Sequence, residues 1–230
     1  MLEQVMKTVQ ECFDLSQIEE YTVEAGRPDC TDLEKLMIIK KYGANRVSIN
    51  PQTFSDSVLN AIGRKHTSAD FLRAYESARN SGIKDINVDL IAGLPYEDYD
   101  SFGRSFDAVY AMEPEELQLG FLKVLKGAYL YPDTKKYGIC YSHTPPYEVL
   151  YTKELSYDEI IRLKNIEEMV EVYYNSRQFG CSLRFMEAFF ETPFRMYEAL
   201  GDYYEERGLF SLSHSRLRRY EILKEFFFYQ

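Results

Sequence analysis

The chain has 230 residues, 45% of them hydrophobic and 15% aromatic, so it is long enough to bury a sizeable core. Its 27 Lys and Arg stand against 37 Asp and Glu, a net charge of -10. Broad nucleic-acid binding relies on positive charge, so this balance argues against a nucleic-acid partner. No apolar run approaches the roughly 20 residues that span a bilayer, so no membrane association is expected.

The cysteines and histidines do not form a recognisable metal-binding pattern. The cysteines form no CxxC pair, and neither the cysteines nor the histidines cluster in the sequence as metal ligands do. We therefore expect no metal site from them. The N-terminus also lacks the basic start and apolar block of a signal peptide, which together with unpaired thiols predicts a cytoplasmic protein. The residues concerned are Cys12, Cys30, Cys140, Cys181, His66, His143 and His214.

Residues 1–123 alternate helix-like and strand-like segments, the pattern of parallel βαβ units. The strands contain apolar runs, which predicts a sheet covered on both faces. Gly43 and Gly82 are expected to end helices, and Ser68 to cap one. In chain order we expect a helix at 2–13, a strand at 19–25, a helix at 32–42, a strand at 45–51, helices at 55–62 and 68–81, a strand at 86–95, a helix at 98–112 and a strand at 116–123.

Beyond residue 123 the pattern changes. A segment rich in Tyr, Gly and Pro precedes a run of helices, the first of which begins with a capping box formed by Ser156 and Glu159. Further helices are expected at 182–190, 193–206 and 213–227. We therefore divide the chain into a partial α/β barrel at 1–125, a connecting loop at 126–154 and an α-helical domain at 155–230.

Polar residues stand near the ends of the predicted strands. Glu24 ends the first strand, Gln52 follows the second, Asp89 lies in the third, and Arg64 lies in a loop that reaches the same rim. In parallel βα folds ligands bind at the carboxyl ends of the strands. Two carboxylates, an amide and an arginine suit a zwitterionic ligand, because a carboxylate binds an ammonium group and an arginine binds a carboxylate.

Each residue also has a purely structural interpretation. Glu24 is able to pair with Arg27, and Asp89 with Arg46 or Arg64 or with the backbone of a neighbouring loop. Asn50 and Gln52 are able to act as turn formers around Pro51. Taken singly these interpretations are favoured, whereas the convergence of four such residues favours a binding site.

Three segments resemble the radical S-adenosylmethionine superfamily, and most closely the oxygen-independent coproporphyrinogen dehydrogenases. They are EYTVEAGRPD, YGANRVSINPQTFSDSVLNAIGRKHT and INVDLIAGLP, within about residues 15–95. The resemblance implies a partial barrel of six βα units, with S-adenosylmethionine across the strand ends. By motif, Glu24 would hold its ammonium group, and Gln52, Arg64 and Asp89 would contact a sulfonium cosubstrate, which in that family can be a second molecule. A porphyrinogen is the substrate implied.

Residues 89–230 resemble the C-terminal helical domain of cobalamin-binding radical S-adenosylmethionine proteins. The segments are DLIAGLPYEDYDSF, ELQLGFLKVLKG, PYEVLYTKELSYDEI and IEEMVEVYYNS. This resemblance implies an unknown substrate and cobalamin on an upstream domain that is absent here. The first segment is common to both groups, which leaves open whether the two parts are a natural combination.

The sequence departs from the family in one respect. The resemblance implies a [4Fe-4S] cluster held by CxxxCxxC, and this motif is absent. We therefore expect strands three to six of the barrel, with no catalytic competence in this chain alone, and a first strand whose open edge favours self-association. The alternatives are the C-terminal portion of a radical S-adenosylmethionine oxidoreductase and a non-catalytic, cluster-free module that binds a ligand or partner.

Overall fold

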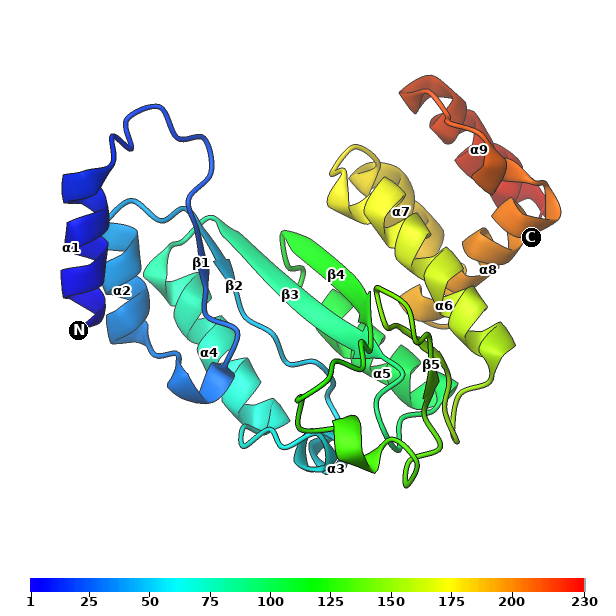
Figure 1. Ribbon diagram of the computed structural model, residues 1–230. Coiled ribbons are helices and arrows are strands. Elements are labelled where there is room, and N and C mark those ends of the chain that lie inside the picture. The colour runs from blue at the N-terminus through cyan, green and yellow to red at the C-terminus, as the bar shows by residue number, and fades with distance from the viewer. Residues whose placement is uncertain (230) are drawn as a thin grey trace.

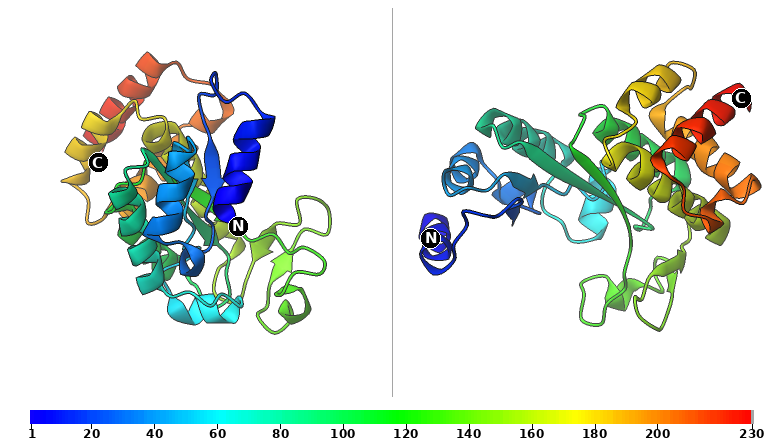
Figure 2. Two further views of the ribbon diagram at one scale, coloured as in Figure 1. Left: turned by 90° about the vertical axis from the view of Figure 1, so that its left-hand side faces the viewer. Right: turned by 90° about the horizontal axis from the view of Figure 1, so that it is seen from above.

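A computed structural model describes residues 1–229. Four parallel strands form one sheet in the order β1–β2–β3–β4, which is also their order in the chain, as the βαβ pattern predicts. Figure 1 shows the N-terminal helices beyond one edge of this sheet and the C-terminal helices beyond the other, and the view from above in Figure 2 agrees. Within the described residues no helix has both the length and the hydropathy that a membrane crossing requires.

The predicted elements are confirmed in kind, with shorter strands than expected. The four strands are β1 (Thr22–Glu24), β2 (Arg46–Ser48), β3 (Asp85–Ala92) and β4 (Glu116–Phe121). The helices of this part are α1 (Leu2–Cys12), α2 (Leu33–Lys41), α3 (Asp56–Ala61), α4 (Ser68–Ser81) and α5 (Tyr99–Tyr110), with a 3-10 turn at Pro28–Cys30.

The start of α4 corrects one prediction. Thr67, not Ser68, is the N-cap: its hydroxyl accepts a hydrogen bond from the Asp70 N–H, and the Asp70 carboxylate accepts one from the Thr67 N–H. Ser68 lies inside the first turn because the acidic partner of a capping box stands three residues after the cap. The predicted Ser156–Glu159 box is present, and Gly82 ends α4 in the left-handed conformation.

The connecting segment is more ordered than a plain loop. It contains a 3-10 turn at Tyr131–Asp133 and an antiparallel ribbon of β5 (Cys140–Tyr141) and β6 (Val149–Tyr151). The ribbon joins the end of β4, where the Val149 N–H donates to Leu122 O at 2.8 Å. The helical part then comprises α6 (Tyr157–Met169), a π-helical turn at Val170–Asn175, α7 (Gly180–Glu187), α8 (Pro193–Glu206), a 3-10 turn at Leu209–Ser211 and α9 (Arg216–Tyr229).

The sheet has one apolar and one polar face, which corrects the expectation of two apolar faces. Val47, Ile86, Val88 and Leu117 are fully buried in the core. Most alternate positions are polar, and the register aligns four of them in one row across the strands, Glu24, Ser48, Asn87 and Glu116. Since side chains alternate between faces of a strand, this row marks a surface that is built for polar contacts.

Candidate functional site

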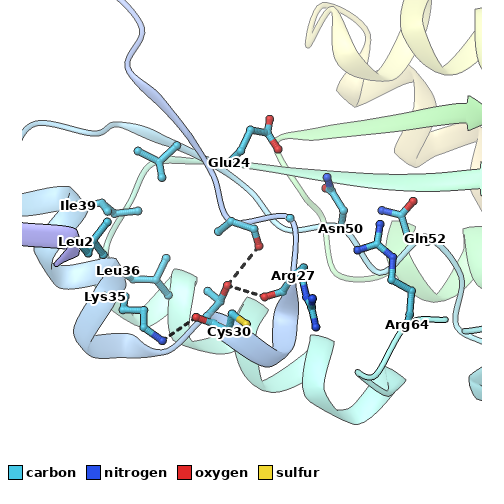
Figure 3. Close-up of a pocket in the computed structure, with 14 residues that line it drawn as sticks. Leu2, Glu24, Arg27, Cys30, Lys35, Leu36, Ile39, Asn50, Gln52 and Arg64 are labelled. Carbon is cyan, nitrogen blue, oxygen red and sulfur yellow. Dashed lines mark hydrogen bonds between the residues drawn. The ribbon is translucent and has the colours of Figure 1, made fainter. Parts of the chain in front are cut away.

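A cleft of about 570 Å³ opens at the carboxyl ends of β1 and β2. Three of the four predicted site residues line it, namely Glu24, Gln52 and Arg64 (Figure 3). Glu24 ends β1, Gln52 lies in the segment after β2, and Arg64 follows α3. The structure thus brings together, from three separate segments, a carboxylate, an amide and a guanidinium.

None of these three side chains has a partner within residues 1–229. The Arg64 guanidinium, the Glu24 carboxylate and the Gln52 amide make no ion pair or hydrogen bond from their side chains there. Figure 3 shows the Arg64 guanidinium reaching toward the Gln52 amide, with Asn50 between Gln52 and Glu24. Charged and polar groups without protein partners remain free to bind a ligand.

The opposite wall of the cleft is largely apolar. Leu36 and Ile39 of α2, both buried, line it together with Leu2 of α1. Cys30 and Lys35 lie on the same side, and the Lys35 ammonium donates to Cys30 O at 2.8 Å. A cleft with one polar and one apolar wall suits a small molecule that carries both a charged group and a flat apolar part.

Local backbone geometry directs Gln52 and Arg64 into the cleft. Gln52 has a left-handed conformation, with φ 70°, and its backbone is fixed to β3 by two bonds. Its N–H donates to Asp89 O at 3.2 Å, and its carbonyl accepts from the Ile91 N–H at 2.9 Å. Arg64 follows Gly63, which adopts a φ of 73° without steric strain because glycine has no Cβ. The Arg64 N–H donates to Leu59 O at 2.9 Å.

Asp89, the fourth predicted residue, lines a separate cavity of about 290 Å³. It lies in the middle of β3, opposite Gln118 of β4, and its Oδ1 accepts from Asn87 Nδ2 at 3.0 Å. Burial raises the pKa of Asp89 to about 6, against the lowering effect of the Asn87 hydrogen bond, and the charges of Glu24 and Glu116 raise it further. Glu167 and Glu171 line the same cavity.

The salt-bridge interpretations of these residues are wrong. Arg27 pairs with Asp29 at 2.8 Å rather than with Glu24, and Arg46 pairs with Glu20 and Glu116 rather than with Asp89. The turn interpretation is partly right, because Gln52 does form a left-handed turn after Pro51. A backbone role and a side chain in the cleft are therefore combined in one residue.

Sequence reasoning missed two features of the site. Cys30, set aside as incidental, lines the cleft. Asn50, one of the polar residues at the end of the second predicted strand but not among the four predicted site residues, is buried and lines the cleft, with its Oδ1 accepting from the Ser48 hydroxyl at 2.9 Å. The signal for Asn50 was its position just after the apolar run of the second strand, since ligands bind at the carboxyl ends of parallel strands.

The residues present do not fit an iron–sulfur cluster. The four cysteines are free thiols, and among residues 1–229 no three His, Cys, Asp or Glu side chains converge in a way that would hold a metal ion. A cluster of this kind is ordinarily held by three or four convergent thiolates. We therefore derive no chemical step through such a cluster from this chain.

Comparison with known proteins supports the resemblance. Residues 3–109 match the model of the radical SAM superfamily, and residues 135–230 match a protein family of unknown function (DUF4080). The oxygen-independent coproporphyrinogen-III oxidase-like protein HemZ of Bacillus subtilis is 37% identical over 159 residues, which cover 66% of this chain and 32% of that protein. The heme chaperone HemW of the same organism is 35% identical over 133 residues, covering 58% and 34%.

The fold agrees with a solved relative. The structure of coproporphyrinogen III oxidase (HemN) from Escherichia coli, described as a Radical SAM enzyme, aligns with a TM-score of 0.55 at 21% identity. The alignment covers 71% of this chain and 35% of that one. The chain thus spans about a third of the length of the curated relatives described above.

The match to the superfamily model, the curated relatives and the parallel sheet with its cleft at the strand ends agree with one another. Residues 3–109 of this chain are thus similar to the radical SAM superfamily, and the chain shares the fold of one of its solved members.

Proposed function

We propose that this chain binds S-adenosylmethionine in the cleft at the ends of β1 and β2, and that it is the cosubstrate-binding, C-terminal portion of a coproporphyrinogen dehydrogenase-like oxidoreductase. The observation that carries the proposal is the set of three unpartnered side chains, Glu24, Gln52 and Arg64, lining one cleft. The superfamily match over residues 3–109 supports the choice of ligand.

Each wall of the cleft receives a different part of the ligand. The Glu24 carboxylate holds the ammonium group of the methionine moiety, and the Arg64 guanidinium holds its carboxylate. Each pair joins opposite charges through hydrogen bonds, and both side chains line the same cleft. Leu36 and Ile39 pack against the adenine ring. Asp89 supports the site from β3, where its carbonyl accepts the Gln52 N–H and its side chain faces the polar surface of the sheet.

The relatives support a tetrapyrrole as the other ligand. Their names refer to a coproporphyrinogen oxidase and to a heme chaperone, and we propose a porphyrinogen as the substrate class. Cobalamin, expected from residues 89–230, remains a prediction, because the family matched by residues 135–230 is described only as one of unknown function.

A non-catalytic ligand-binding module is the second candidate. It is favoured by the absence, within the part of the chain that the structure describes, of a residue set that would hold a metal. Anaerobic reconstitution with iron and sulfide tests whether this chain alone is a competent enzyme, which neither candidate expects. A stoichiometric cluster on the purified chain would favour a competent enzyme, and failure would favour either a portion of one or a binding module.

Isothermal titration of the 230-residue chain with S-adenosylmethionine tests the shared core of both candidates. Arg64→Gln and Glu24→Gln are each expected to weaken binding about tenfold or more, because each removes one charge-assisted hydrogen bond. Arg73→Gln is the matched control, since Arg73 lies exposed on α4 and pairs with Asp70. Equal affinities for Arg64→Gln and Arg73→Gln would reject the proposed site.

A further inference from the structure

A buried carboxyl group is hydrogen-bonded to Thr53, the residue that follows Gln52 of the cleft. Glu97, in the segment between β3 and α5, is fully buried, with 0% of its surface exposed. The Thr53 hydroxyl donates to Glu97 Oε1 at 2.5 Å, and the Ser105 hydroxyl lies 3.5 Å from the same oxygen. Glu97 Oε2 has no hydrogen-bond partner within the described residues. A buried glutamate without a cation is unusual and asks for an explanation.

The partner of Glu97 adjoins the cleft residue Gln52. The Thr53 hydroxyl, besides bonding Glu97, accepts from the Ser55 N–H at 3.0 Å, and the Ser105 hydroxyl accepts from the Phe54 N–H at 3.1 Å. On the other side of the segment, His66 Nε2 lies 3.3 Å from Pro51 O. Side chains on both sides thus hold the segment Pro51–Ser55, in which Gln52 adopts its left-handed conformation.

The charge state of Glu97 follows from what surrounds it. Burial raises the pKa of its carboxyl to about 7, and the charge of Asp98 raises it further, against the lowering effect of hydrogen bonds from Thr53 and Ser105. Across the segment the titratable group is His66, which contacts Pro51 and not Glu97. The packed groups that touch the carboxyl are hydroxyls, so no cation compensates its ionised form.

We propose that Glu97 is a positioning residue for the cleft, which acts through Thr53 and Ser105 to hold the segment Pro51–Ser55 so that the Gln52 side chain enters the binding site. The part that concerns ligand affinity rests on the proposed function. The neutral carboxyl accepts both hydroxyls without placing a charge in the core. Ionisation strengthens these two hydrogen bonds but leaves a charge on the buried Oε2, which has no partner within the described residues, and opening the segment to water would relieve that cost.

The first experiment compares S-adenosylmethionine affinity by isothermal titration between pH 6 and pH 8. Thr53→Val is expected to weaken binding about tenfold at pH 6, the equivalent of one lost hydrogen bond. Glu97→Gln keeps an acceptor but cannot ionise, so its affinity relative to the unmodified chain is expected to rise by about threefold or more toward pH 8. Taking the ratio at each pH removes the ligand's own titration.

The second experiment measures amide hydrogen exchange in the chain without ligand. Thr53→Val is expected to raise exchange at Gln52, Phe54 and Ile91, whose N–H groups depend on this segment. Asp107→Asn is the matched control. Asp107 lies on α5, the helix that carries Ser105, and its half-buried carboxyl accepts a hydrogen bond from the Phe194 N–H and does not touch the segment Pro51–Ser55.

The outcomes separate the two proposals. Altered exchange with no ligand binding by the unmodified chain would reject the proposed function and retain the positioning role. Unchanged exchange in Thr53→Val, or a pH profile of Glu97→Gln that parallels the unmodified chain, would overturn the positioning role even where S-adenosylmethionine binds.

Discussion

The two outer edges of the sheet are treated differently by the chain. At the β4 edge, Asn175 Oδ1 accepts from the Leu117 N–H at 3.0 Å, and Asn175 Nδ2 donates to Leu117 O at 3.0 Å. One side chain of the π-helical turn thereby reproduces the two bonds that a neighbouring strand would make. This edge is covered at Leu117, and the same two bonds fix the helical part of the chain to the sheet.

The β1 edge has no such cover within residues 1–229. Its bonds to β2 use Tyr21 O and Ala25 N, so the N–H of Thr22 and the carbonyl of Glu24 point outward. The neighbouring α1 leaves Val5 and Phe13 exposed, at 54% and 66%. The cleft lies beside this open edge, so the part of the sheet that carries the proposed binding site is also the part that is open to another strand.

Removing the closure at β4 is expected to have the largest effect. Asn175→Ala leaves two backbone groups of Leu117 unpaired at a partly buried position, which should lower the free energy of unfolding by about 2–4 kcal/mol. Urea unfolding measures this change. Asn165→Ala is the control, because Asn165 makes one exposed side-chain bond to Glu205. Equal costs for the two variants would show that Asn175 does not close the edge.

The carboxyl of Asp89, between the two edges, is expected to give a smaller effect that depends on pH. Its pKa is about 6 in the folded chain and 3.8 when exposed, so the folded state binds its proton more tightly. The resulting loss of stability is absent below about pH 4, grows as the pH rises and is complete above about pH 6. Asp89→Asn cannot ionise, so the free energy of unfolding of this variant should fall by about 1–2 kcal/mol less than that of the unmodified chain between these pH values. The figure is reduced because the Asp89 carboxyl keeps partial contact with solvent.

Thermal unfolding of both chains between pH 4 and pH 8 measures this effect. Identical pH dependence of the two chains would mean that Asp89 is solvated in the folded state. The polar face of the sheet near β4 would then also be open to water.

Changing the open edge is expected to have the smallest effect on stability. Thr22→Pro removes an outward N–H and one exposed side-chain hydrogen bond, from the Thr22 hydroxyl to Glu20, so the free energy of unfolding should change by less than about 1 kcal/mol. Any self-association of the chain should fall, as measured by size-exclusion chromatography with light scattering. Val23→Pro, which removes an inward N–H, should destabilise the chain more. Association that persists in Thr22→Pro would place the contact elsewhere.

Much of the fold could be predicted because local signals agreed with it. Helix caps such as Asp32 and the Ser156–Glu159 box act within four residues, and the apolar strands are the core of the sheet. The polar face was not predicted, because Ser48 and Asn87 look like interruptions in apolar runs until register places them in one row. The β5–β6 ribbon was hidden by its short strands.

Three residues that line the cleft could be named from the sequence, whereas the geometry of the cleft could not. Glu24, Gln52 and Arg64 do share a cleft, whereas Asp89 lines a second cavity. The register of β3 and β4 places Asp89 in the middle of its strand, opposite Gln118, and the sequence does not give that register. Glu97 could not be found from the sequence, because a single glutamate after a Pro-Tyr turn is ordinarily exposed. Only the packing of Thr53 and Ser105 around it shows that it is buried.

The agreement between strand order and chain order bears on how the molecule is made. Each strand pairs with the one synthesised just before it, so the sheet is able to grow from β1 to β4 as the chain emerges. Asn175 follows Leu117 by 58 residues, and until it has been synthesised the last strand has an uncovered side. Within residues 1–229 the newly made sheet therefore has two edges with unpaired backbone groups, and the π-helical turn later covers one of them at Leu117.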